Sequence, residues 1–301
     1  MASTYRTIIA ESDLPPEMAD QVLGEFLWAV GEQVMHPFEF EPYHRLVTEP
    51  FDYYTFGLDF FRPLVDKGQS TVNGRERLHR IDAQLAAGEN VIFLANHQSE
   101  ADPQIISLLL EDEWPDLGKE MIFVAGERVI ADPMTAPFSM GRNLLCIYSK
   151  RHIEHPPERK AAKILHNRKT MERMAELLGE GGHAVFVAPS GGRDRPDANG
   201  VVQVAPFDPQ NIEMFRLMAQ RAGRPTHFYP MALATYDIMP PPEKVEIELG
   251  EHRRLRRCPV HLTIGEELDF DRVADEDRDA RRAARAKAAW EAVRDAYEAF
   301  R

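Results

Sequence analysis

The feature that most constrains the fold is an alternation of two patterns from about residue 75 onward. Short apolar or β-branched runs alternate there with longer stretches whose apolar residues recur at helical spacing. We expect strands at 91–94, 121–124, 144–147, 184–187, 228–233 and 245–249, and helices at 75–87, 103–111, 159–178, 211–222 and 276–300. Such alternation is typical of a sheet with helices on its faces. The sequence therefore predicts an α/β fold, with a mixed sheet flanked by helices.

The first 75 residues have a different, helical pattern. Leu14-Pro15-Pro16-Glu17 is typical of a helix start, and apolar residues then recur at helical spacing from Val22 to Val34. Prolines 37, 42, 50 and 63 divide the region into short helices. A chain of 301 residues is long enough for two unequal domains. We expect a small helical bundle over residues 1–75, with its aromatic residues as core, and an α/β domain over residues 76–301.

Composition and charge exclude several classes of protein. The net charge of −13 disfavours a general binder of nucleic acid or of anionic membranes. The sequence has no apolar run long enough for a transmembrane span, and its first twelve residues resemble neither a secretory signal nor a transit peptide. Two cysteines, Cys146 and Cys258, do not make a disulfide framework, which fits a reducing compartment.

The segment after the first expected α/β strand carries candidate acid–base chemistry. Asn96-His97 follows that strand, and Asp102-Pro103 comes at the start of the next expected helix. Asp102 could be only a helix cap, because aspartate before proline is a good one. A carboxylate near a histidine can also fix its tautomer and stabilise the imidazolium, as a general base acting on an alcohol requires. His97 and Asp102 are therefore a candidate catalytic pair, although His-x4-Asp alone is a short motif.

Cationic side chains follow two other expected strands. Lys150-Arg151-His152 comes after strand 144–147, and Ser190-Gly191-Gly192-Arg193-Asp194-Arg195 comes after strand 184–187. The glycines allow the backbone to approach a ligand closely, and the two arginines can present forked donors to one phosphate. The alternative is a charged turn in which Asp194 pairs with one arginine. Because ligand groups gather beyond the carboxyl ends of strands, these loops favour a phosphorylated substrate.

These segments resemble the soluble, plastid-type glycerol-3-phosphate 1-O-acyltransferases, within the wider His-x4-Asp glycerolipid acyltransferase superfamily. The resemblance covers roughly residues 10–270 and is densest from 90 to 250. It is carried by segments 96–103, 123–129, 137–144, 148–152, 188–196 and 237–242. The histidine motif alone indicates only the superfamily, whereas the arginine segment and Pro240-Pro241-Pro242 are more specific.

The resemblance implies the activity and the roles of six residues. The reaction would transfer a fatty acyl group from acyl carrier protein, or from acyl-CoA, to the sn-1 hydroxyl of glycerol 3-phosphate. Its product would be lysophosphatidic acid, in the first step of phospholipid synthesis. His97 and Asp102 match the family's catalytic pair. The residues that match its phosphate pocket are Arg151, His152, Arg193 and Arg195. Arginine 151 departs from the family's Lys-Lys-His pattern and keeps the charge there.

The resemblance also implies the cofactor, the partners and the compartment. We expect no metal and no cofactor, since the acyl thioester is a co-substrate. Acyl carrier protein is acidic, so a local basic surface would have to bind it. The candidates are residues 252–257 and the cluster of Lys160, Lys163, Arg168 and Lys169, either of which could be only a solvated charged face. The cytoplasm suits a bacterial enzyme, and the plastid stroma suits a mature plant or algal form.

Three alternative functions remain open from the sequence. The first is an acyltransferase of the same superfamily that uses lysophosphatidate or another acceptor, although the membrane anchor that often accompanies such lipid acceptors is not visible in the sequence. A transient membrane association without a transmembrane segment stays open for the main interpretation. The second is a metal-dependent phosphohydrolase with His97 and Asp102 as ligands, although the further ligands it needs are not evident. The third is a non-catalytic binder of sugar phosphates or dinucleotides, and no G-x-G-x-x-G segment follows the strand before His97.

Overall fold

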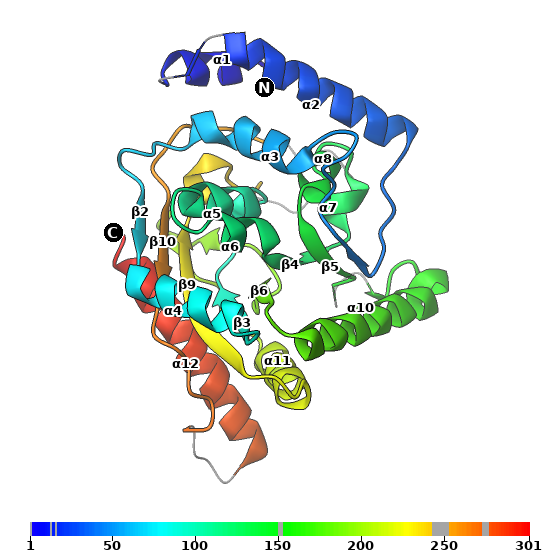
Figure 1. The fold of residues 1–301 in the computed structure, drawn as a ribbon, viewed down its shortest axis with the longest axis vertical. Coiled ribbons are helices and arrows are strands. Elements are labelled where there is room, and N and C mark those ends of the chain that lie inside the picture. The colour runs from blue at the N-terminus through cyan, green and yellow to red at the C-terminus, as the bar shows by residue number, and fades with distance from the viewer. Residues whose placement is uncertain (1, 13, 16, 150–152, 243–252, 273–276) are drawn as a thin grey trace. The chain divides into compact units, whose positions relative to one another are not determined.

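The computed structural model describes residues 2–12, 14–15, 17–149, 153–242, 253–272 and 277–301. The chain forms two compact units (Figure 1). Unit 1 consists of Met1–Ser70, Ser99–Thr170 and Thr235–Val260, and unit 2 of Thr71–Gln98, Met171–Ala234 and His261–Arg301. Each unit combines helices with strands that pair in both directions, so the expected α/β class with a mixed sheet is confirmed.

The described residues of unit 1 form three strands and most of the short helices. The strand order is β1 (Tyr43–His44), β5 (Asn143–Ile147) and β4 (Ile122–Gly126), with β1 antiparallel to β5 and β4 parallel to it. Its helices are α1 (Ala2–Ala10), α2 (Glu17–Met35), α3 (Tyr53–Phe61), η1 (Arg62–Leu64), α5 (Asp102–Leu110), α6 (Pro115–Glu120), α7 (Arg128–Ala131), α8 (Ala136–Met140), η2 (Pro157–Arg159), the first half of α10 (Lys160–Glu180) and η3 (Tyr236–Ile238).

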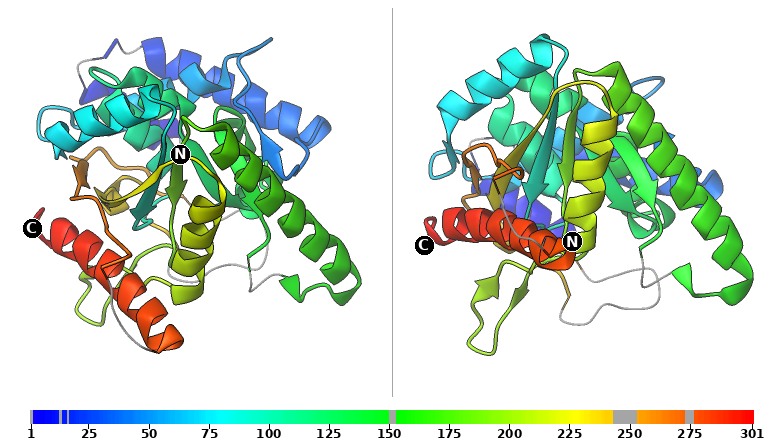
Figure 2. Two further views of the ribbon diagram at one scale, coloured as in Figure 1. Left: turned by 60° about the horizontal axis from the view of Figure 1, so that its bottom comes forward. Right: turned by 90° about the horizontal axis from the view of Figure 1, so that it is seen from below.

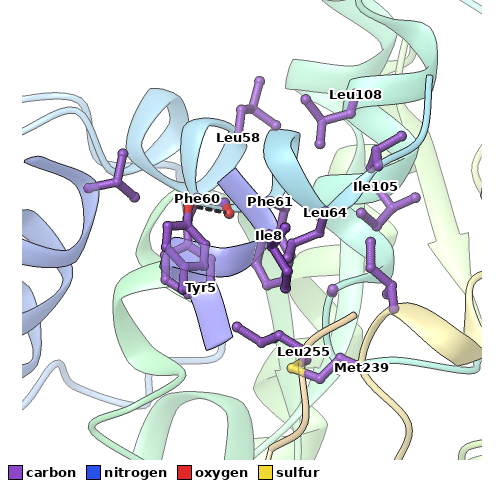
Figure 3. Close-up of a cluster of buried hydrophobic side chains, with 14 of the residues drawn as sticks. Tyr5, Ile8, Leu58, Phe60, Phe61, Leu64, Ile105, Leu108, Met239 and Leu255 are labelled. Atoms are coloured by element: carbon purple, nitrogen blue, oxygen red, sulfur yellow. Dashed lines mark hydrogen bonds between the residues drawn. The ribbon is translucent and has the colours of Figure 1, made fainter. Parts of the chain in front are cut away.

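The core of unit 1 joins the N-terminal helices to α5 (Figure 3). Tyr5 of α1 stacks on Phe60 of α3 at 5.0 Å between ring centroids, and its hydroxyl donates to the Phe60 carbonyl at 2.9 Å. Ile105 and Leu108 of α5 belong to the same buried cluster. Each large apolar side chain buried in this way contributes roughly 1.5–3 kcal/mol. Phe56, Phe60 and Phe61 of the expected aromatic stripe are therefore core, whereas Trp28 of α2 is exposed.

The N-terminal region contributes to sheets as well as to helices. Helix α2 ends before Pro37 as expected, but residues 38–52 contain no helix and Pro63 lies within η1. Residues 43–44 pair with β5, and residues 71–73 form a further strand. Residues 1–70 share a compact unit with α5 and with residues 235–260. A self-standing helical bundle is therefore not evident, and the domain boundary between residues 75 and 76 stays a prediction.

Unit 2 contains the strand that precedes His97. The strand order is β6 (Ala184–Val187), β3 (Asn90–Ala95), β9 (Thr226–Ala234), β10 (His261–Ile264) and β2 (Thr71–Asn73). β3 is parallel to β6 and β9, whereas β10 is antiparallel to β9. The other elements are α4 (Arg75–Ala86), the second half of α10, α11 (Pro209–Arg221), α12 (Arg278–Glu298) and the hairpin β7 (Arg195–Pro196) with β8 (Val202–Gln203). Helix α12 packs against β9 and α11 (Figure 2).

The expected elements of the α/β region agree closely with the structure. Strand β6 has the predicted bounds, and the other predicted strands and helices that fall on described residues begin and end within two residues of the predicted bounds. Strands β2 and β10 lack an uninterrupted apolar run and were not predicted. The expected strand 245–249 lies outside the described residues. In the part of the chain that the structure describes, no helix combines the length and hydropathy needed to cross a membrane.

Candidate active site

The end of β3 fixes the position of His97. All six residues of β3 are buried, as in a parallel strand covered on both faces. The side chain of Asn96 continues the pairing with β9, since its Oδ1 accepts from the Leu233 amide at 2.8 Å and its Nδ2 donates to the Leu233 carbonyl at 2.9 Å. Asn96 and Gln98 are buried, whereas His97 between them is half-buried. His97 therefore follows a completely buried strand and is itself only half-buried.

Residues 189–196, which we call the arginine loop, follow β6. In the parallel pair of β3 and β6, Leu94 lies opposite Val187, so His97 and the arginine loop leave the same edge of the sheet. Gly191 has a φ of 68°, a conformation that favours glycine. The carbonyl of Pro189 accepts from the Asn211 side chain at 2.8 Å, which attaches the loop to α11. Arg193 and Arg195 of this loop are half-buried.

Buried Asp194 connects the arginine loop to the segment around His97. The amide of Asp194 donates to the carbonyl oxygen of His97 at 2.6 Å. Its Oδ2 accepts from Asn96 Nδ2 at 2.8 Å and from Gln98 Nε2 at 3.2 Å. Its Oδ1 accepts from the Ala205 amide at 2.9 Å. Burial raises the pKa of Asp194, and these hydrogen bonds oppose that rise. Unit 2 thus brings together three of the predicted site residues, His97, Arg193 and Arg195.

The carboxylate of Asp102 is held inside unit 1. Asp102 is the first residue of α5 and is fully buried. Its Oδ1 accepts from Thr235 Oγ1 at 2.6 Å and from the amide of Ser99 at 3.2 Å. The position before it, Ala101, is the helix cap and has no side-chain cap bond. Asp102 therefore does not occupy the expected cap position, and its carboxylate bonds back to the turn that precedes the helix.

The remaining two predicted site residues cannot be placed. Arg151 and His152 lie outside the described residues. The strand before them, β5, is present with nearly the predicted bounds. Their role as phosphate ligands stays a prediction.

Arg253 is not an exposed docking cation, which corrects one expectation for residues 252–257. Its Nε donates to Glu100 at 2.8 Å and its Nη2 to Asp132 at 2.9 Å, and only 10% of its side chain is exposed. Burial lowers the pKa of Arg253, but the two carboxylates more than offset this effect and raise it above its ordinary value. The sequence could not show this pairing, since Glu100 lies 153 residues away.

Replacing Arg253 by alanine is expected to destabilise the protein by about 2–3 kcal/mol. Breaking a fully buried ion pair costs about 3–5 kcal/mol, and the slight exposure of Arg253 reduces that value. Urea unfolding followed by circular dichroism measures the change. Arg254→Ala is the matched control, because that neighbouring side chain is exposed and its loss should cost less than about 0.5 kcal/mol. Equal stabilities of the two variants would contradict the role of Arg253.

The second basic cluster is only partly a surface. Lys163 is buried, donates to the carbonyl of His155 at 2.6 Å and lies 5.0 Å from the ring centre of Tyr148. Lys160 pairs with Glu154 at 2.8 Å. Arg168 and Lys169 are exposed on α10. Lys160, Arg168 and Lys169 are therefore exposed, whereas Lys163 is not part of the surface.

The two cysteines could supply a nucleophile, and clustered acidic side chains could supply a metal site. Burial raises the pKa of the Cys146 and Cys258 thiols to about 12, so neither forms a thiolate nucleophile near neutral pH. Within the described ranges, no group of three or more His, Cys, Asp or Glu side chains is arranged to hold a metal ion.

Comparison with known proteins defines the class. A family model described as acyltransferase matches residues 69–234, more than half of the chain. A chloroplastic glycerol-3-phosphate acyltransferase of Cucurbita moschata is 42% identical over 304 residues, covering 99% of this chain and 68% of that protein. Those of Arabidopsis thaliana and Pisum sativum are 43% and 42% identical, over 88% and 99% of this chain and 58% and 66% of their own lengths. The chain therefore belongs to the family of the plastid-type glycerol-3-phosphate acyltransferases, as the resemblance indicated.

Proposed function

We propose that this protein transfers a fatty acyl group from a thioester to the sn-1 hydroxyl of glycerol 3-phosphate, which yields lysophosphatidic acid. The observation that carries the proposal is the hydrogen bonding of the His97 segment to the arginine loop through Asp194. A base and two forked cations are thereby held in one compact unit. That arrangement suits an acceptor with a hydroxyl at one end and a phosphate at the other. The relatives named above are glycerol-3-phosphate acyltransferases, which supports this acceptor.

In the proposed mechanism the phosphate binds Arg193 and Arg195, together with Arg151 and His152. His97 then removes the proton of the sn-1 hydroxyl as that oxygen attacks the thioester carbonyl. The carbon–sulfur bond breaks, and His97 returns the proton to the departing thiolate. The carboxylate of Asp102 orients the imidazole and stabilises its charged form. The mechanism uses no covalent acyl-enzyme, no metal and no cofactor.

The hydrogen bonds of Asp102 suit this orienting role. The Thr235 hydroxyl and the Ser99 amide both donate to Oδ1 of Asp102, and these two bonds fix the position of the carboxylate. Only four residues separate Asp102 from His97 on the chain. A positioned carboxylate supports a general base because it fixes which ring nitrogen carries the proton.

Removing either arginine side chain should weaken binding of the acceptor selectively. For Arg193→Ala and Arg195→Ala we expect KM for glycerol 3-phosphate to rise about 10–100-fold, because each lost charge-assisted hydrogen bond is worth roughly 1.5–3 kcal/mol. KM for the acyl thioester should change less than threefold, since the donor is proposed to bind elsewhere. Steady-state kinetics with each substrate varied in turn measures both constants. Equal increases for the two substrates would contradict phosphate binding by this loop.

The acyl donor and the compartment belong to the same proposal. Acyl carrier protein is the proposed donor, with acyl-CoA as a substitute, and exposed Arg168 and Lys169 are the cations of the α10 cluster best placed to meet an acidic partner. The relatives are named chloroplastic, which supports the plastid stroma as the compartment. No comparison supports the cytoplasm, the other compartment expected from the sequence.

A direct assay tests the proposed function against its alternatives. The full chain is incubated with glycerol 3-phosphate and with carrier-protein or CoA thioesters of several chain lengths, and lysophosphatidic acid is measured by mass spectrometry. We expect thioester-dependent product that persists with a chelator present. Acylation of lysophosphatidate in place of glycerol 3-phosphate would assign the other acceptor. Phosphate release that the chelator abolishes would indicate the phosphohydrolase.

A further inference from the structure

Three buried polar side chains form a layer beneath the proposed site. Asn96, Gln98 and Asp194 are almost completely buried, whereas the residues between and beside them, His97, Arg193 and Arg195, are half-buried. The buried residues therefore bond to one another inside unit 2, and the half-buried ones remain accessible to a substrate.

Asp194 makes the bonds that join the two halves of this layer. Its amide donates to the carbonyl of His97, and its carboxylate accepts from the side chains of Asn96 and Gln98. Asp194 thus holds His97 and both of its chain neighbours. On the other side of the carboxylate, the Ala205 amide holds the chain just after the hairpin β7–β8. Both carboxylate oxygens thus accept hydrogen bonds, and none of these three bonds comes from an arginine.

We propose that Asp194 is a positioning residue that sets the separation between His97 and the two arginines. The inference rests on the proposed function, in which a small acceptor must reach the base and the arginines at once. Glycerol 3-phosphate is short and its phosphate is fixed by the arginines, so its hydroxyl reaches His97 only at one spacing. A misplacement of about 1 Å can cost roughly 100-fold in rate.

Asparagine at position 194 disturbs this spacing with the smallest possible change. The carboxylate accepts on both oxygens, from Ala205 on one and from Asn96 and Gln98 on the other. An amide has one oxygen only, so in either orientation its NH2 group meets an N–H donor. For Asp194→Asn we expect kcat to fall about 100-fold and the Kd of glycerol 3-phosphate, measured calorimetrically without a donor, to rise about tenfold.

Two further variants keep the test decisive if Asp194→Asn folds poorly. Gln98→Met preserves volume and removes the 3.2 Å bond to Asp194, so kcat should fall about three- to tenfold. Asp197→Asn is the matched control. Asp197 lies on the same segment and accepts from the amides of Asn199 and Val201, but its side chain is exposed and bonds within its own hairpin. Its replacement should leave kcat and Kd within twofold of the wild-type values.

A double-mutant cycle separates positioning from a merely structural role. If the two residues act independently, the increases in the Kd of glycerol 3-phosphate caused by Asp194→Asn and Arg195→Ala should multiply in the double variant. If they share a role, Arg195→Ala should raise this Kd at least fivefold less in the Asp194→Asn background than in the wild type. Multiplying effects, or an unchanged kcat in folded Asp194→Asn, would overturn the proposal. Absence of wild-type turnover would refute the proposed function, and the binding cycle would still decide the role of Asp194.

Discussion

Replacing His97 by alanine is expected to lower kcat for acyl transfer by about 10³-fold. One imidazole serves as the base toward the hydroxyl and as the acid toward the thiolate, and such catalysis contributes roughly 10²–10⁴-fold. The fold should persist, since His97 is half-buried at the end of β3 and its described backbone bond to Asp194 does not involve the ring. Release of the free thiol measures turnover, and circular dichroism measures the folded fraction.

The control for this variant is a histidine of the same unit without a proposed role. His79 is exposed on α4, and His79→Ala should retain turnover within twofold. A His97→Ala enzyme that keeps turnover within tenfold of the wild type would contradict the general-base assignment. A loss of turnover that matched a loss of folded protein would reassign His97 to a structural role.

Asp102→Asn and Asp102→Ala are both expected to lower kcat, but only the alanine variant should also be less stable. Asp102→Asn keeps an oxygen that can accept from Thr235 and from the Ser99 amide, whereas Asp102→Ala leaves both of these donors without that acceptor. Both remove the negative charge, and kcat should fall about 10²–10⁴-fold in each. Only Asp102→Ala should lose about 2–3 kcal/mol of unfolding free energy, because buried donors without an acceptor are costly.

Urea unfolding and thiol release, applied to both variants, test this expectation. Asp52 is the matched control, because its carboxylate also accepts from backbone amides at a helix start, those of Tyr54 and Thr55. Asp52→Ala should lose about 1 kcal/mol and keep full turnover. If Asp102→Asn turned over like the wild type, Asp102 would serve only to stabilise the start of α5, which is the alternative that the sequence left open.

The sequence predicted the α/β region well because its signals are local. Strand β6 and helix α5 follow from apolar runs and from a proline at a helix start, each of which lies within ten residues. Signals were weaker where pairing partners are distant. Strands β2 and β10 are three and four residues long, and only their pairing with each other and with β9 identifies them as strands.

The candidate site was predictable in part for the same reason. His97 and the arginine loop each follow an apolar strand, and parallel strands bring such segments to one edge. The sequence did not reveal that Asp194 bonds to residues 96 and 98, because the two segments lie almost a hundred residues apart. The sequence suggested Arg253 as a docking cation, because a run of arginines does not reveal which of its members face water and which face buried carboxylates.

By itself, the sequence determined the α/β class, and it predicted an acid–base pair and arginines for a phosphorylated acceptor, which stay predictions. These depend on residue type and on spacing along the chain, which the amino-acid order contains. Only the tertiary structure decided what each charged side chain contacts. It assigned Arg253 to Glu100 and Asp132, and Asp194 to the residues on both sides of His97. The physical reason is that the free energy of a charge depends on its burial and its partners, and strand order brings those partners from distant segments.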